Sequence, residues 1–147
     1  MEAMADPTET PPALLELTTY LLSKVGKDAR HRLAELLAAE GLRLYHHAAL
    51  AALADFGPHT QRDLAVRLGL DPSDLAKAAD RLAAAGWLDR TRDPADRRRL
   101  TLTLTPAGAA RLAELTALAG GVQDEVLAPL APAERATLHG LLLRLHG

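Results

Sequence analysis

Cysteine is absent from the 147 residues of this chain, which excludes disulfide bonds, thiolate redox sensing and cysteine-ligated zinc. Aromatic residues are scarce, with one Trp, two Tyr and one Phe, so the stacking platforms on which single-strand and RNA-binding modules hold unpaired bases are lacking. No stretch approaches the ~20 apolar residues of a membrane-spanning helix, and the N-terminus lacks the layout of a secretory signal. We expect a cytoplasmic protein without membrane association, and duplex DNA if a nucleic acid is bound.

The formal net charge of −2 conceals an uneven distribution of charged residues. Residues 60–105 contain eight Arg and one Lys against seven Asp, whereas the rest of the chain contains eight basic and twelve acidic residues. On charge alone, a local excess of two positive charges is ordinary surface variation, but the clustering of the arginines in residues 90–99 indicates a basic module that contacts an anionic partner. The apolar content of 48% suffices for one substantial core rather than two independent domains.

The segment DRRRLTLTLTPAG, residues 96–108, predicts half of a β-hairpin. Residues 100–105 alternate leucine with threonine, and successive side chains on a strand point to opposite faces, so the leucines face the core and the threonines face water. Residues 88–92 can form the antiparallel partner, and residues 93–96, Asp-Pro-Ala-Asp, have turn chemistry. The pattern predicts a two-stranded wing whose tip carries guanidinium groups.

Upstream of this hairpin, the sequence predicts two helices joined by a tight turn. Thr60 can cap a short helix that runs to about Leu68 and ends at Gly69. Asp71 and Pro72 form an N-cap and first-turn pair for a second helix that extends to residue 85. A helix-turn-helix of this kind reads base edges in the major groove from the start of its second helix. The side chains there are Ser73, Lys77 and Arg81.

The arginines of the hairpin suit a narrow minor groove, where the negative potential is enhanced. Arg97, Arg98 and Arg99 lie at the tip, and Arg90 and Arg92 lie on the opposing strand. The two aspartates of the turn are expected to orient these arginines and to close the turn. The alternative is a solvated charge run without a partner.

The flanking segments have helical spacing of apolar residues. A helix is expected from Pro11 to Glu40, weakened in its middle by Gly26, and another over residues 42–56. A long helix should follow Gly108 until Pro129 and Pro132 interrupt it, with a last helix behind. The expected organisation is a flexible arm (1–12), an N-terminal dimerisation helix (13–40), a winged helix-turn-helix DNA-binding region (41–108) and C-terminal dimerisation helices (109–147).

The wing resembles the signature of the multiple antibiotic resistance regulator (MarR) family, D-x-R-x-x-x-[VL]-x-L-T-x-x-G. Asp96 and Arg98 match its first pair, residues 102, 104 and 105 match its strand, and Gly108 matches its last position. Residues 60–65 and 71–82 are also similar to the helix-turn-helix of that family, so the resemblance covers roughly residues 40–147. Ala76 departs from the polar residue that many members carry in the second helix, so the base preference is not transferred.

The resemblance implies a mainly α fold with a small β-hairpin, in which a winged helix-turn-helix is flanked by N- and C-terminal dimerisation helices. It implies a homodimer in which Arg98 enters the minor groove, Asp96 steadies it and the helix near Pro72 occupies the major groove. The candidate DNA-binding residues are Thr60, Gln61, Ser73, Lys77, Arg81, Arg90, Arg92, Asp96, Arg97, Arg98 and Arg99. The terminal helices carry leucine stripes that a small winged helix cannot cover, which also favours a dimer and hence a palindromic operator. Packing of the terminal helices within one chain is the alternative.

The predicted function is a transcriptional regulator, a repressor that a small aromatic or phenolic ligand releases from DNA. Such ligands are implied by the resemblance, and the candidate effector-binding residues are His31, Arg43, Tyr45 and His46. Capping or solvated roles for these residues are the alternative. The alternative function is a winged-helix module for protein interaction or architecture, without an effector. The salt dependence of binding distinguishes DNA recognition from this alternative.

We expect no enzymatic activity, because the sequence contains no phosphate-binding glycine loop, nucleophile elbow or paired metal-ligand motif. We also expect no cofactor and no metal. His46 and His47 are adjacent and point about 100 degrees apart on a helix, which suits one ligand rather than two.

Overall fold

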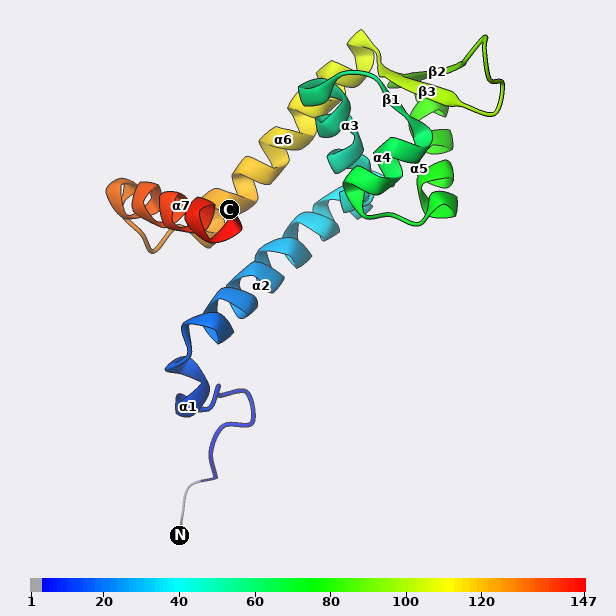
Figure 1. Ribbon diagram of the computed structural model, residues 1–147. Helices are drawn as coiled ribbons and strands as arrows, with labels where there is room; N and C mark the ends of the chain where they lie inside the picture. The colour runs from blue at the N-terminus through cyan, green and yellow to red at the C-terminus, as the bar shows by residue number, and fades with distance from the viewer. Residues whose placement is uncertain (1–3) are drawn as a thin grey trace. The chain divides into compact units, whose positions relative to one another are not determined.

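A computed structural model describes residues 4–147 (Figure 1). The chain divides into two compact units, one of residues 33–121 and the other of the segments up to residue 32 and from residue 122. The elements are, in order, α1 (Pro12–Leu15), α2 (Thr18–Ala39), α3 (Leu44–Phe56), β1 (His59–Thr60), α4 (Gln61–Leu68), α5 (Pro72–Ala84), β2 (Leu88–Arg92), β3 (Leu100–Leu104), α6 (Pro106–Val126) and α7 (Pro132–His146). The mainly α fold class with a small sheet is confirmed.

The hydrophobic core belongs to the unit of residues 33–121. Its largest fully buried side chains are leucines from helices and strands alike, namely Leu37, Leu42, Leu50, Leu64, Leu75, Leu82, Leu102 and Leu115. Because each helix contributes one apolar stripe and β3 contributes one face, the elements must meet around a common centre to exclude water. Trp87 packs against this cluster while remaining partly exposed.

The helix-turn-helix forms where its caps predict it. The Thr60 hydroxyl accepts a hydrogen bond from the Asp63 backbone N–H at 3.1 Å, and the Asp71 carboxylate accepts one from the Ser73 N–H at 2.8 Å. Each cap satisfies a donor that the first turn of a helix leaves unpaired. Gly69 ends α4 in the left-handed region with φ 64, which a glycine adopts at no steric cost.

The predicted hairpin is present, but the sheet has a third strand that the sequence did not reveal. Its strand order is β1-β3-β2, and both pairings are antiparallel. Leu88 lies opposite Leu104 and Arg92 lies opposite Leu100 in the β2–β3 pair. The two residues of β1 pair with Leu102 and Thr101. A strand of two residues is too short for period-2 alternation to signal it, so the prediction of a two-stranded wing was incomplete.

The leucine–threonine alternation holds over the centre of β3 and fails at its end. Leu102 is fully buried and Thr103 is exposed, as expected. Thr105 is not a strand residue: its hydroxyl donates to the Gly86 carbonyl oxygen at 2.6 Å and accepts from the Gly108 N–H at 3.0 Å. The side chain therefore joins the end of the hairpin to the start of α6.

The expected first helix is divided. It ends at Leu15, resumes at Thr18 and then runs through Gly26 without interruption. The second expected helix, residues 42–56, begins two residues later than predicted, at Leu44. Of the expected N-terminal arm, residues 1–3 lie outside the described part of the chain. Behind them the Glu9 N–H donates to the Asp6 carbonyl oxygen at 3.0 Å and closes a turn.

The unit made of the segments up to residue 32 and from residue 122 exposes large apolar side chains. Leu17 lies just before α2, the exposed side chains on α2 include Leu21, Leu22 and Val25, and those on α7 are Leu141, Leu142, Leu143 and Leu145. No helix within residues 4–147 has both the length and the apolar character needed to cross a membrane.

Candidate nucleic-acid interface

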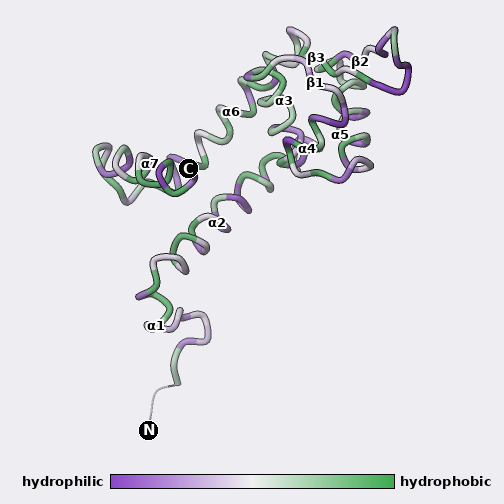
Figure 2. Tube along the Cα trace, in the orientation of Figure 1, coloured by the Kyte–Doolittle hydropathy of each residue, from purple (hydrophilic) through white to green (hydrophobic). Residues whose placement is uncertain are grey.

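The loop between β2 and β3 presents Arg98 to solvent. Hydrophilic residues gather along this loop, which projects from the sheet (Figure 2). The Arg98 side chain is 93% exposed, and its Nε lies 3.5 Å from the Asp96 carboxylate. The same carboxylate oxygen accepts a hydrogen bond from the Arg98 backbone N–H at 3.0 Å. An exposed ion pair of this kind adds little stability, but the backbone hydrogen bond to Asp96 fixes the main chain that carries the guanidinium.

Backbone hydrogen bonds close the loop around this arginine. The Asp93 N–H donates to the Arg99 carbonyl oxygen at 2.9 Å, and the Asp93 carboxylate accepts from the Ala95 N–H at 2.8 Å. Arg92 donates from Nη1 to the Arg97 carbonyl oxygen at 2.7 Å. The loop is therefore an ordered turn that leaves the side chains of Arg97, Arg98 and Arg99 exposed.

Arg90 does not join the arginines of the loop. Its Nη1 lies 2.5 Å from the Asp80 carboxylate, so the guanidinium links β2 to α5. Because Asp80 neutralises it, Arg90 offers less charge to an external anion than the sequence suggested.

The start of α5 exposes Ser73 and Lys77. The Ser73 hydroxyl donates to Asp71 at 2.7 Å, so its oxygen remains free to accept. Arg81, two turns into the helix, is partly buried, and its guanidinium carbon lies 5.2 Å from the centre of the Trp87 ring. This contact anchors Arg81 on the protein and separates its role from that of Lys77.

Five of the predicted site residues lie around one groove of about 940 Å³: Thr60, Gln61, Asp96, Arg98 and Arg99, which share it with Arg62, Asp63 and Pro72. The groove thus connects the start of α4, the start of α5 and the wing. Among residues 4–147, the Gln61 Oε1 atom is one of two buried side-chain polar atoms without a hydrogen-bond partner. An unsatisfied buried acceptor costs free energy, which a donor from a partner could recover.

The predicted effector residues Arg43, Tyr45 and His46 lie at the start of α3. His46 is only 6% exposed, and its Nδ1 accepts from the Arg43 backbone N–H at 2.9 Å. Burial lowers the pKa of His46 below its ordinary value, and the nearby charges of Arg81 and Arg43 lower it further. His46 therefore caps the helix as a neutral imidazole. His31 is exposed on α2, in the other compact unit.

Sequence reasoning missed a cluster around Trp87. Arg111 forms ion pairs with Glu40 and with Glu114, the latter at 2.6 Å, and its guanidinium carbon lies 5.2 Å from the Trp87 ring centre. Only the spacing of three residues between Arg111 and Glu114 carries a local signal. Within residues 4–147, no group of three or more His, Asp or Glu side chains is placed to hold a metal ion.

Comparison with known proteins places this architecture in a family. Residues 31–99 match the model of the MarR family. A putative transcriptional regulatory protein for the hcr operon of Thauera aromatica is 35% identical over 73% of this chain and 64% of its own length. The transcriptional repressor NicR of Pseudomonas putida is 30% identical over 65% of this chain and 61% of its own length. The chain thus spans less than two thirds of either curated relative.

Solved structures match over nearly their whole length. A probable transcriptional regulator from Pseudomonas aeruginosa is 34% identical, covers 90% of this chain and 98% of its own, and has a TM-score of 0.70. BpsR of Bordetella bronchiseptica, described for its regulation by 6-hydroxynicotinic acid, is 27% identical with a TM-score of 0.70 (93% and 98% covered). A mutant MarR from E. coli complexed with operator DNA is 25% identical with a TM-score of 0.67 (93% and 99% covered). The family match, these relatives and the winged helix-turn-helix together establish that the chain belongs to the MarR family.

Proposed function

We propose that this protein is a transcriptional regulator that binds duplex DNA as a homodimer. The observation that carries the proposal is the groove in which Arg98 and Arg99 of the wing lie together with Thr60 and Gln61 of α4. The arginines on the wing side of the groove and the polar residues on its α4 side can each contact a phosphate or a base edge. The start of α5 then enters the major groove. The MarR mutant solved with operator DNA is a structural relative.

Arg98 is the proposed minor-groove contact. It is 93% exposed and is oriented through Asp96, whereas Arg90 is neutralised by Asp80 and Arg81 is held on Trp87. We therefore rank Arg98 first among the arginines, with Arg97 and Arg99 as phosphate contacts. A dimer would present two α5 helices about 34 Å apart, or a multiple of that distance, to a palindromic operator.

A mobility-shift titration tests the wing. The DNA is the region flanking the gene of this protein, and protection mapping identifies the bound site. Arg98→Ala should weaken DNA binding by about tenfold or more, a loss of roughly 1–3 kcal/mol. The affinity of Arg98→Lys should lie between those of Arg98→Ala and the wild type. Arg144→Ala, an exposed arginine on α7, is the matched control. Unchanged affinity of Arg98→Ala would reject the wing assignment.

The salt dependence of binding separates DNA recognition from the alternative, a protein-interaction module. If the wing and α5 neutralise several phosphates, the logarithm of the binding constant should fall steeply and linearly with the logarithm of salt concentration. Binding to duplex DNA that is insensitive to salt would contradict the proposal.

We further propose that the protein acts as a repressor and that a small aromatic or phenolic acid releases it. NicR is named a repressor, and BpsR is described as regulated by 6-hydroxynicotinic acid. In this chain Arg43 offers a guanidinium that can hold a carboxylate bidentately, and Tyr45 follows it by two residues in the first turn of α3. His46 could contribute only its Nε2, since Nδ1 is occupied.

Release of DNA by such acids is the test of the effector site. A panel of hydroxylated aromatic acids that includes 6-hydroxynicotinic acid is titrated into the protein–DNA complex. Arg43→Gln should bind DNA as the wild type does but respond at least about tenfold more weakly to the active acid. An undiminished response would place the effector elsewhere.

A further inference from the structure

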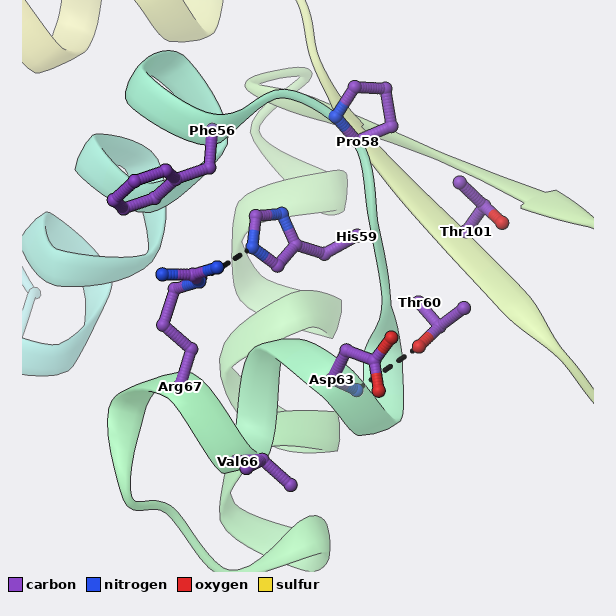
Figure 3. Close-up of a pocket in the computed structure, with 8 residues that line it drawn as sticks. All are labelled: Phe56, Pro58, His59, Thr60, Asp63, Val66, Arg67 and Thr101. Atoms are coloured by element: carbon purple, nitrogen blue, oxygen red, sulfur yellow. Dashed lines mark hydrogen bonds between the residues drawn. The ribbon is translucent and has the colours of Figure 1, made fainter.

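A second cavity is bounded by the end of α3, β1, the outer face of α4 and β3 (Figure 3). It shares Thr60, Asp63 and Val66 with the groove of the proposed DNA interface. Its volume is about 780 Å³, within the ~300–1,000 Å³ typical of small-molecule sites. The lining residues are Phe56, Pro58, His59, Thr60, Asp63, Val66, Arg67 and Thr101.

The guanidinium of Arg67 is held in place at this cavity. Its Nε–H donates to the Nε2 of His59 at 2.8 Å, and its carbon lies 3.9 Å from the centre of the Phe56 ring. The His59 ring is fixed in turn, because its Nδ1 lies 2.7 Å from the Gly57 carbonyl oxygen. Nδ1 must therefore carry the proton, which leaves Nε2 as the acceptor for Arg67.

The terminal N–H groups of Arg67 have no anionic partner in the part of the chain that the structure describes. Among residues 4–147, no carboxylate forms an ion pair with Arg67, although Asp63 lies one helical turn before it. A guanidinium fixed by a hydrogen bond and a ring contact loses little conformational entropy on binding an anion. Its free edge matches a carboxylate, which two parallel N–H groups can hold.

The remaining walls of the cavity define the rest of the ligand. Phe56 and Val66 are 63% and 76% exposed, so apolar surface is available to a small apolar body. Asp63 also lines the cavity, and its carboxylate forms no hydrogen bond or ion pair with the residues of the described range. A carboxylate in that position accepts a donor and repels a second anion.

We propose that this cavity is a second ligand site, distinct from the effector residues of α3, which takes a small carboxylic acid bearing a hydrogen-bond donor at its other end. Arg67 holds the carboxylate, Phe56 and Val66 contact the body, and Asp63 accepts the donor. The site is separate from the proposed effector residues, because none of Arg43, Tyr45 or His46 lines it.

Calorimetric titration of the full chain without DNA tests the proposal. The probes are 4-hydroxybenzoate, benzoate, which lacks the donor, and 4-hydroxybenzamide, which lacks the charge. We expect 4-hydroxybenzoate to bind most tightly and the amide at least about tenfold more weakly. Amide chemical shifts should move over residues 56–67 when 4-hydroxybenzoate is added. Equal affinity for the acid and the amide would overturn the assignment.

Two variants locate the site, and one control separates it from the effector residues. Arg67→Gln should weaken 4-hydroxybenzoate by about tenfold or more. Val66→Glu should do the same by repulsion, and because Val66 is exposed it should leave the fold intact. In Arg43→Gln, the addition of 4-hydroxybenzoate should move the amide chemical shifts of residues 56–67 as it does in the wild type. If both cavity variants bind as the wild type does, or if only the shifts around residues 43–46 respond, the proposal is wrong.

Discussion

At the scale of single residues, Gly108 occupies a position where no side chain fits. A Cβ at this position would lie 1.9 Å from the Trp87 carbonyl oxygen and 2.7 Å from a methyl of Leu104. The first of these is backbone, which cannot rotate away. The glycine thus allows the first turn of α6 to approach the root of the wing, and this explains why a wing signature ends with it.

Gly108→Ala should lower the free energy of unfolding by about 3 kcal/mol, since overpacking against backbone costs at the upper end of the usual range. Gly120→Ala is the matched control on the same helix, because nothing lies within 4 Å of its added Cβ. That variant should gain up to about 1 kcal/mol from helix propensity. Urea denaturation measures both, and equal stability of the two variants would contradict the close contact.

His46 should make stability depend on pH. Its pKa in the folded chain is lowered from 6.5, mainly by burial, so above pH 6.5 both the folded and the unfolded chain carry the neutral imidazole. Below pH 6.5 the unfolded chain takes up the proton first, and the free energy of unfolding falls until the folded pKa is reached. His47, whose pKa burial also lowers, acts in the same direction.

His46→Gln should flatten this dependence, because the amide oxygen can still accept from the Arg43 N–H and does not titrate. His139→Gln, at an exposed position on α7, serves as the control. Thermal denaturation between pH 5 and 8, a range chosen to bracket the ordinary histidine pKa of about 6.5, gives the slopes. The hypothesis fails if His46→Gln and the wild type have the same slope.

At the scale of secondary structure, the sequence predicted those element boundaries that caps and turn residues determine locally. The caps at Thr60 and Asp71 and the left-handed Gly69 fixed α4 and α5 within a residue of their observed bounds. The turn between residues 93 and 96 likewise placed the two long strands. The break between α1 and α2 was missed, because the spacing of apolar residues continues across it.

Contacts between residues far apart in sequence were beyond such signals. The pair of Arg111 and Glu40 spans 71 positions, and the bond of Arg90 to Asp80 joins a strand to a helix. Both depend on how elements pack, which no periodicity encodes. The resemblance to a family supplied the proposed roles of Asp96 and Arg98, but the cavity at Arg67 and the buried state of His46 needed the structure.

Lys77 tests the reading role of α5. It is exposed one turn after the helix start, and on the proposed function it meets base edges in the major groove. Lys77→Ala should change the ranking of operator variants in a mobility-shift series, by roughly 1–3 kcal/mol at the affected base pair. Asp55→Ala, at an exposed position on α3, is the control. Uniform weakening across all sequences would make Lys77 a phosphate contact instead.

At the scale of the whole molecule, the exposed leucines of α2 and α7 indicate a partner surface. Isolated apolar side chains are common on protein surfaces, but contiguous ones mark contact sites. On the proposed function they are covered by a second copy of this chain. On this proposal, the unit that carries the wing binds DNA through its basic residues, and the unit of the terminal segments forms the dimer through its apolar residues.

Sedimentation equilibrium tests this assembly. The wild-type chain should be a dimer, and the double variant Leu141→Glu/Leu145→Glu should shift it toward the monomer, because two buried carboxylates per copy oppose the contact. Val66→Glu places the same charge on an exposed apolar site of α4 and should remain dimeric. A monomeric wild type would overturn the dimer, and with it the palindromic operator.

The outer position of β2 has a consequence for solubility. Among residues 4–147, β3 is paired on both sides, whereas β2 has a neighbour on one side only and leaves its other backbone edge open. Open edges recruit strands from other molecules, and charged side chains are a common defence. Asp89, Arg90 and Arg92 supply that defence, so replacing them with apolar residues should promote intermolecular strand pairing and aggregation even in preparations free of DNA.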